Sequence, residues 1–274
     1  MIRKLGMLAL VLAIAGCAQP RTGAEIASGT KTAATVLVER DVPADWKRFV
    51  PKKATVSRTQ WFGSASPAVL GTFEKPEDLA VITEGMRTAV KINGMLDVAK
   101  SEYDLVLEDK DGGSYTFHLW LGGKTGLKGM YMYVSDTGTG YTMNESITDR
   151  LRALIHGLRY EPERAKANGD VVNLFGKITN LDRWKKFVEN VNEGTRDEAH
   201  FTDYTIEGDP IFRDLLYDGQ RIEFTYDNSK DAYGTPDKAL VFCDGIDFGK
   251  TEQGTRYILT GCDRDNPAFN FTVE

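Results

Sequence analysis

The stretch VSDTGTGYTM at residues 134–143 contains DTGT at 136–139, the tetrad that carries the catalytic carboxylate in aspartic proteases. Such a protease needs two carboxylates that share one proton, from two copies of the motif or from a symmetric dimer. This chain has one copy, and Ser135 stands before the aspartate where the protease motif has an apolar residue. Glycine, aspartate and threonine between Tyr133 and Tyr141 are also typical of a hairpin turn. We therefore interpret the tetrad as a turn.

The three histidines are the next candidates for acid–base chemistry. The alternating stretch SYTFHLWL predicts that His118 is a half-exposed strand residue. His156 falls on the polar side of a predicted helix, and His200 stands beside Glu198 in a turn-like segment, so both are expected to be solvated. A Ser-His-Asp triad assembles from distant residues and stays an alternative, but the chain has no GxSxG elbow. The sequence identifies no catalytic residue and favours a protein that is not an enzyme.

A possible metal site lies in the second half of the chain. If Asp218-Gly219 forms a two-residue hairpin turn, Pro210 faces Asp227 across the hairpin. Crowded like charges cost free energy unless a cation or a basic partner offsets them, and calcium of weak affinity is the expected cation. The alternative is that the side chains extend into water and are screened there. No other cofactor is expected. The predicted metal ligands are Glu207, Asp209, Asp227 and Asp231.

The N-terminus indicates export. Arg3 and Lys4 precede an apolar run from Leu5 to Ala15, which is too short to span a membrane. The following LAIAGC resembles the bacterial lipobox, in which a cysteine receives a diacylglyceryl group and the signal is cut off just before it. This resemblance implies a signal peptide at 1–16 and a lipidated, palmitate-bearing Cys17; a secretory signal that ends near a cysteine by chance is the alternative. Because two acyl chains anchor stably, we expect a protein held at the cell membrane and facing the exterior.

The segment behind Cys17 is small, polar and aperiodic, which predicts a flexible tether over residues 17–45. The formal net charge of the chain is -6, and the predicted signal removes two cations and no acids. An acidic protein is a poor partner for nucleic acid, so none is expected. Only Cys243 and Cys262 remain as cysteines, and in an exported chain they predict a disulfide rather than a zinc site, which needs further ligands.

The rest of the chain predicts an α+β fold of two small domains, each an antiparallel sheet with one or two packed helices. Residues 46–160 form the first domain, with helices predicted at 77–93 and around 147–158. The charged segment 161–168 lacks an apolar period and is predicted to be a linker. Residues 169–274 form the second domain, in which Trp184 belongs to an apolar helical stripe and is expected in the core.

The second domain resembles an uncharacterised domain of Bacillus lipoproteins through GDVVN, GKITNLDRWKKFVENV, YTIEGDPIFRDLLYDG and FTYDNSKDAYG. The first domain resembles the YhfM-like lipoprotein domain through YDLVLEDKDGGSYTFHLWL, SDTGTGY and the helix that follows. These resemblances imply a Gram-positive cell-envelope lipoprotein and no particular activity. We therefore expect a non-catalytic protein that binds an exported protein or an envelope ligand. The alternative is a surface hydrolase that acts on cell-envelope material.

Overall fold

The structure is a computed structural model that describes residues 46, 48–264 and 269–273. These described residues belong to one compact unit. The predicted signal peptide, Cys17 and the predicted tether lie outside the described residues. In the part of the chain that is described, no helix is long and apolar enough to cross a membrane.

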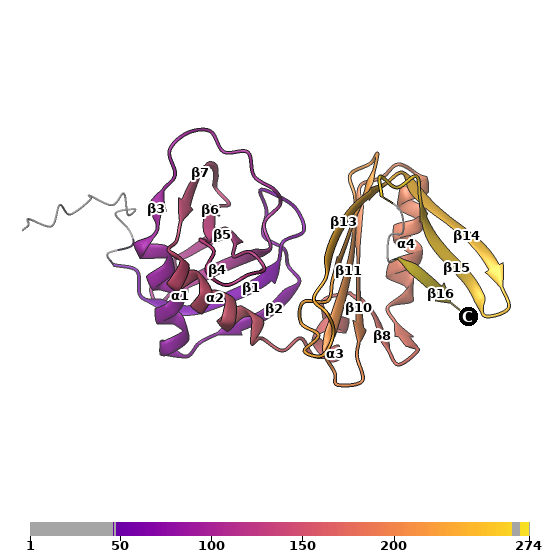
Figure 1. Cartoon of the computed structure of the whole chain (residues 1–274), viewed down its shortest axis with the longest axis horizontal. Helices are drawn as coiled ribbons and strands as arrows, with labels where there is room; N and C mark the ends of the chain where they lie inside the picture. The colour runs from indigo at the N-terminus through magenta and orange to yellow at the C-terminus, as the bar shows by residue number, and fades with distance from the viewer. Residues whose placement is uncertain (1–45, 47, 265–268, 274) are drawn as a thin grey trace, which may run out of the picture. The chain divides into compact units, whose positions relative to one another are not determined.

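The first half contains a seven-stranded sheet in the order β2-β1-β4-β5-β6-β7-β3, with two helices packed on one face (Figure 1). All of its neighbouring strands are antiparallel. Apolar side chains of the helices and of the sheet form one core. The elements are β1 (Pro51–Arg58), β2 (Val69–Phe73), α1 (Pro76–Thr88), β3 (Val90–Lys91), β4 (Tyr103–Asp109), β5 (Ser114–Trp120), β6 (Met130–Tyr133), β7 (Asp136–Thr142) and α2 (Glu145–His156).

The two helices of this half have clear sequence causes. Pro76 starts α1, where its missing N–H is no loss, and the helix ends at Thr88 because Val90 pairs with β7. It is therefore shorter than the predicted 77–93. The side chain of Asn144 accepts a hydrogen bond from the Ile147 N–H and caps α2. A Cβ on Gly85 of α1 would lie 2.9 Å from a Leu151 methyl group, so this glycine allows the close approach of the two helices.

The second half contains a six-stranded sheet in the order β13-β12-β11-β10-β8-β9 and a three-stranded sheet in the order β14-β15-β16. The strands of the larger sheet are antiparallel except for the β10–β8 pair. The elements are β8 (Val171–Leu174), β9 (Lys177–Thr179), α4 (Leu181–Asn192), β10 (Asp197–Tyr204), β11 (Pro210–Tyr217), β12 (Ile222–Asp227), β13 (Lys238–Cys243), β14 (Gly245–Thr251), β15 (Gly254–Thr260) and β16 (Asn270–Val273).

Helix α4 supplies the centre of the second core. Trp184 is fully buried, as predicted, and its ring contacts Phe201 of β10 and Tyr257 of β15. The helix therefore packs against strands of both sheets. The disulfide between Cys243 and Cys262 is present and joins the end of β13 to the segment after β15. The fold is α+β with two sheet-rich halves, as the sequence predicts.

The hairpin of β11 and β12 has a longer turn than predicted. Tyr217 pairs with Ile222, so four residues, 218–221, form the connection. Asp218 explains the difference, because its Oδ1 accepts hydrogen bonds from the Gln220 and Arg221 N–H groups and stabilises a wider turn. The predicted register is wrong by two residues: Asp227 faces Phe212 and not Pro210.

The segment 161–168, expected to be a linker, contains the short helix α3 (Pro162–Ala167). Ala165 is fully buried, and the Arg164 guanidinium donates a hydrogen bond to the Leu70 carbonyl at 3.1 Å. The core of the first sheet also takes in apolar residues from β8, β10 and β11. The single buried alanine thus provides an apolar contact that the charged composition of this segment did not predict.

Candidate functional site

The DTGT tetrad belongs to a hairpin, as predicted, but it forms the strand that follows the turn. Residues 134 and 135 make the turn, Asp136 pairs with Tyr133, and β7 continues to Thr142. Asp136 Oδ1 accepts a hydrogen bond from the Gly138 N–H at 3.2 Å. This carboxylate therefore stabilises its own hairpin.

His118 forms a buried pair with Asp104, which faces it across β4 and β5. The His118 side chain is 0% exposed, and its Nδ1 lies 2.8 Å from Asp104 Oδ1. The same carboxylate accepts hydrogen bonds from the Thr59 hydroxyl at 2.6 Å and from the Ser66 N–H at 2.7 Å. The prediction of a half-exposed histidine is wrong, because the loop around Phe62 covers this face of the strand.

The second ring nitrogen of His118 is also occupied. The Gly63 N–H donates to Nε2 at 2.9 Å, so Nε2 has to be the unprotonated nitrogen and Nδ1–H the donor to Asp104. A general base needs a free lone pair within reach of a substrate proton. In this arrangement His118 offers none, and the pair has a structural role.

His200 forms a second pair with Asp214, across β10 and β11, at 2.7 Å between Nδ1 and Oδ1. Arg58 of β1 reaches the other carboxylate oxygen at 2.9 Å. The Nε2 atom of His200 lies 2.6 Å from the side-chain amide nitrogen of Gln60 and 3.8 Å from a Glu198 oxygen. Because the oxygen and nitrogen of an amide exchange places when the group is turned over, the amide can also accept from a protonated Nε2. The prediction that His200 is solvated is wrong, since its side chain is 11% exposed.

Charges fix the protonation state of this second pair. Burial lowers the pKa of His200, but the Asp214 carboxylate outweighs burial and raises the pKa to about 9. Burial raises the pKa of Asp214, but Arg58 and His200 outweigh it and hold that pKa well below its usual range. At neutral pH the three groups are two cations that share one carboxylate, with Glu198 nearby.

The four predicted metal ligands do not come together. Asp209 accepts a hydrogen bond from the Ala232 N–H, Asp231 from the Tyr233 and Gly234 N–H groups, and Asp227 pairs with Lys238. Among the described residues, no group of three or more His, Cys, Asp or Glu side chains could hold a metal ion. The register correction explains this, because it moves Asp227 away from Pro210 and Asp209. Calcium binding itself, with Glu207 as the fourth ligand, stays a prediction.

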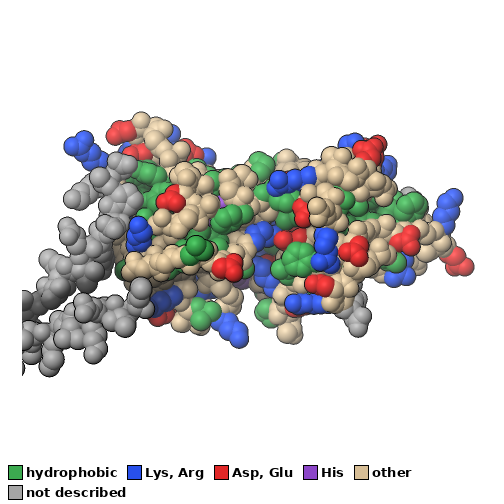
Figure 2. All heavy atoms as spheres, turned by 90° about the horizontal axis from the view of Figure 1, so that it is seen from above, with side chains coloured by type: hydrophobic (Ala, Val, Ile, Leu, Met, Phe, Trp, Pro, Cys, Tyr) green, Lys and Arg blue, Asp and Glu red, His purple; other side chains and the backbone are tan. Residues whose placement is uncertain are grey.

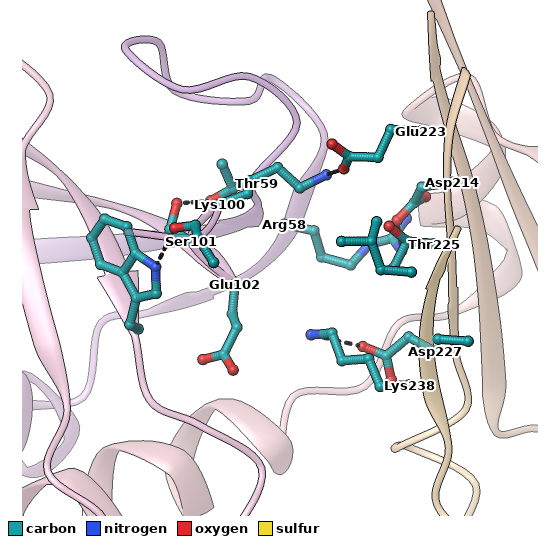
Figure 3. A pocket seen from close by; sticks show the side chains of 14 residues that line it. Arg58, Thr59, Lys100, Ser101, Glu102, Asp214, Glu223, Thr225, Asp227 and Lys238 are labelled. Carbon is teal, nitrogen blue, oxygen red and sulfur yellow. Dashed lines mark hydrogen bonds and ion pairs between the residues drawn. The ribbon is translucent and has the colours of Figure 1, made fainter. Parts of the chain in front are cut away.

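A cavity of about 280 Å³ is the most chemically defined site. Charged side chains lie on two facing walls (Figure 3), one from β1 and residues 99–102, the other from β11, β12 and β13. Trp120, Ala239 and Leu240 add apolar surface. Three ion pairs line the cavity: Arg58–Asp214 at 2.9 Å, Lys100–Glu223, and Lys238–Asp227 at 3.4 Å.

The surface around these elements has mixed character. Figure 2 shows lysine, arginine and acidic side chains interspersed with hydrophobic ones over one face of the molecule. No field of one sign dominates that face. That face therefore provides no long-range field that would attract molecules of one charge.

Comparisons with known proteins find one matching family model in each half of the chain. Residues 57–160 match the model of the YhfM protein family. Residues 168–258 match a family described as Domain of unknown function (DUF4362). These matches confirm the two domain resemblances predicted from the sequence, and the matched ranges meet near α3. The predicted lipoprotein and Bacillus character stays a prediction.

Other comparisons add little. No curated protein matches the chain in sequence. The crystal structure of a thioesterase-like protein from Clostridium sporogenes is similar at 17% identity over 38% of this chain and 93% of that one, with a TM-score of 0.32. A likeness of that size carries no argument about function.

The cavity draws on both matched regions, and this explains why it has no local sequence signal. The wall within the matched residues 57–160 comes from β1 and the segment before β4, and the wall within the matched residues 168–258 comes from β11 to β13. The aspartate–histidine pairs do have a signal. In each, the two residues are 14 positions apart and face each other across one hairpin, so a correct hairpin register would have revealed them.

Proposed function

We propose that the chain is a non-catalytic binding protein of a Gram-positive cell envelope, held at the outer face of the membrane by a lipid on Cys17. Its ligand occupies the cavity of Figure 3. The lipobox-like LAIAGC supports the anchor, and the cavity supports the binding role.

One observation carries the choice of binding over catalysis. The hydroxyl of Ser101, which lines the cavity, donates to the Thr59 hydroxyl at 2.8 Å, and that hydroxyl donates to Asp104 at 2.6 Å. The serine proton is therefore directed into a structural network rather than to a free base, and a nucleophilic serine needs such a base. The cavity lining contains neither histidine nor cysteine.

Site-specific photocrosslinking on intact cells tests this proposal. Benzoylphenylalanine at position 240 stands at the cavity, whereas position 248 on β14 is 58% exposed and does not line the cavity. We expect an adduct of defined mass at position 240 that is absent at position 248. Equal labelling at both positions, or none at position 240, would contradict the binding site.

The competing function, a surface hydrolase acting on cell-envelope material, predicts turnover. Purified full chain should then release soluble products from isolated envelopes, and Ser101→Ala should abolish the release. We expect no release by either protein. Release by the wild type that Ser101→Ala abolishes would replace the binding proposal with a catalytic one.

A further inference from the structure

The charges of the cavity indicate the chemical class of its ligand. The lining holds three cations, Arg58, Lys100 and Lys238, and four carboxylates, Glu102, Asp214, Glu223 and Asp227. Three ion pairs use every cation, so one carboxylate, Glu102, is left over. Accepting the binding function proposed above, we propose that the cavity takes a small organic amine with an apolar body, whose ammonium group pairs with Glu102.

Glu102 is held in place by the backbone. Its Oε2 accepts hydrogen bonds from the Leu121 N–H at 2.6 Å and the Gly122 N–H at 2.9 Å. Within the described part of the chain, Glu102 has no lysine or arginine partner within ion-pair distance. Arg152 binds the carbonyls of the same two residues but pairs with Asp149. A fixed carboxylate with a free oxygen is an acceptor ready for an ammonium group.

The apolar lining suits the rest of such a ligand. Trp120 is fixed by a hydrogen bond from its Nε1 to the Ala99 carbonyl at 2.9 Å, and Leu240 is 42% exposed. An aromatic ring also attracts a cation placed over its face. The volume of about 280 Å³ is near the lower end of the range for small-molecule sites, so the ligand is small.

An anionic ligand fits less well. Each lysine and arginine in the lining already has a carboxylate partner, and an anion would have to displace one. The displaced carboxylate would then lose its ion pair in a partly buried place, which is costly. An amine needs no such exchange.

Titration calorimetry on the full chain in detergent tests whether the cavity prefers an amine. The three probes have the same hydroxyphenyl group and differ in charge. Tyramine carries a positive charge, N-acetyltyramine is neutral, and 3-(4-hydroxyphenyl)propionate is negative. We expect tyramine to bind about tenfold more tightly than the neutral probe, and the anion to bind least. Equal affinity for tyramine and N-acetyltyramine, or no binding of tyramine, would overturn the proposal.

Two matched variants locate the effect. Glu102→Gln keeps an oxygen that accepts from the Leu121 and Gly122 N–H groups, so the melting temperature should not change. We expect the variant to bind tyramine about tenfold more weakly than the wild type does. Glu108→Gln lies on β4 outside the cavity, where Glu108 pairs with Lys53, and should bind tyramine as the wild type does. A Glu102→Gln protein that is folded and binds tyramine normally would overturn the assignment.

The crosslinking experiment at position 240 separates the two proposals. An adduct there together with failure of the tyramine series would refute the amine and leave the binding function standing. Loss of both would refute both. Tyramine should also suppress the adduct at position 240 in a concentration-dependent way, and an adduct insensitive to saturating tyramine would count against the shared site.

Discussion

The two aspartate–histidine pairs are built alike and behave differently. Each joins Nδ1 to Oδ1 across neighbouring antiparallel strands, at 2.8 Å for Asp104–His118 and 2.7 Å for His200–Asp214. In the first pair, a backbone N–H occupies the other ring nitrogen and requires a neutral imidazole. In the second pair, Asp214 and Glu198 raise the pKa of His200, so the ring is charged at neutral pH and the Gln60 amide has to present its oxygen to Nε2–H.

A carboxylate at Nδ1 is therefore compatible with both states of the histidine, and the groups that face Nε2 distinguish the two pairs. An N–H donor at Nε2 selects one neutral tautomer, and an acidic surrounding selects the cation. The same dyad is thus a neutral structural group in one place and an ionic one in the other. An Asp–His contact alone identifies neither a catalytic nor a pH-sensitive site.

Removing Asp104 should have the largest effect. Asp104→Ala leaves three buried donors without their acceptor: the Thr59 hydroxyl, the Ser66 N–H and His118 Nδ1–H. Breaking such a buried network costs about 3–5 kcal/mol of unfolding free energy. Denaturant unfolding measures it, with Asp111→Ala in the exposed turn after β4 as the control. A cost for Asp104→Ala no greater than that of the control would show that the first pair is not a buried network.

The charge on His200 should make stability depend on pH. The pKa of His200 is about 9 in the folded chain against an ordinary 6.5, so its stabilisation is complete below about pH 6.5 and is lost as the pH rises to 9. The loss is on the order of 3 kcal/mol. His200→Gln should remove this decline in unfolding free energy, whereas His156→Gln, at an exposed position, should keep it. Parallel pH profiles for the wild type and His200→Gln would refute the charged state of the second pair.

Much of the fold was predictable because local patterns agree with it. Helical stripes and alternating strands located α2, α4 and the hairpins, and the charged, aperiodic segment 161–168 divided the chain near α3. The errors came where side chains act on the backbone. Asp218 widened a turn through two hydrogen bonds, and the buried Ala165 turned a charged segment into a packed helix.

The candidate site was less predictable. Alternation placed His118 on the open face of the predicted strand. No periodic pattern shows that the loop around Phe62 covers that face. The cavity combines β1, the segment before β4 and strands β11 to β13, and two of its ion pairs, Arg58–Asp214 and Lys100–Glu223, join residues more than a hundred positions apart. Such contacts follow from the tertiary fold, and a single sequence without the fold does not specify them.

Trp61 and Phe62 are neighbours in one loop, and each lies beside a different aspartate–histidine pair. Substituting them one at a time therefore tests the two pairs separately. The Phe62 ring stacks on the His118 ring at 4.9 Å between centroids and is 48% exposed. Phe62→Ala should cost about 1.5 kcal/mol of unfolding free energy, since the cover of the first pair is lost. Denaturant unfolding checks it, and the pH dependence assigned to His200 should not change. An altered pH profile would show that the two pairs are coupled through this loop.

Trp61 belongs to the second pair and should give the smallest effect. Its Nε1 donates to Glu198 Oε2 at 2.5 Å, and the Arg196 guanidinium lies 3.7 Å from its ring centroid. Trp61→Phe keeps an aromatic face for Arg196 but removes the hydrogen bond that holds Glu198 beside His200. Because Glu198 raises the pKa of His200, a Glu198 side chain that is no longer held there should raise it less.

We expect Trp61→Phe to cost about 0.5–1 kcal/mol, the usual contribution of one hydrogen bond, and to lower the pKa of His200. Unfolding measures the first quantity, and an NMR titration of the His200 ring measures the second. Phe62→Ala is the matched control, because it should destabilise the chain more while the pKa of His200 stays as in the wild type. If Trp61→Phe leaves that pKa unchanged, Glu198 does not act on His200, and the charge of the second pair comes from Asp214 alone.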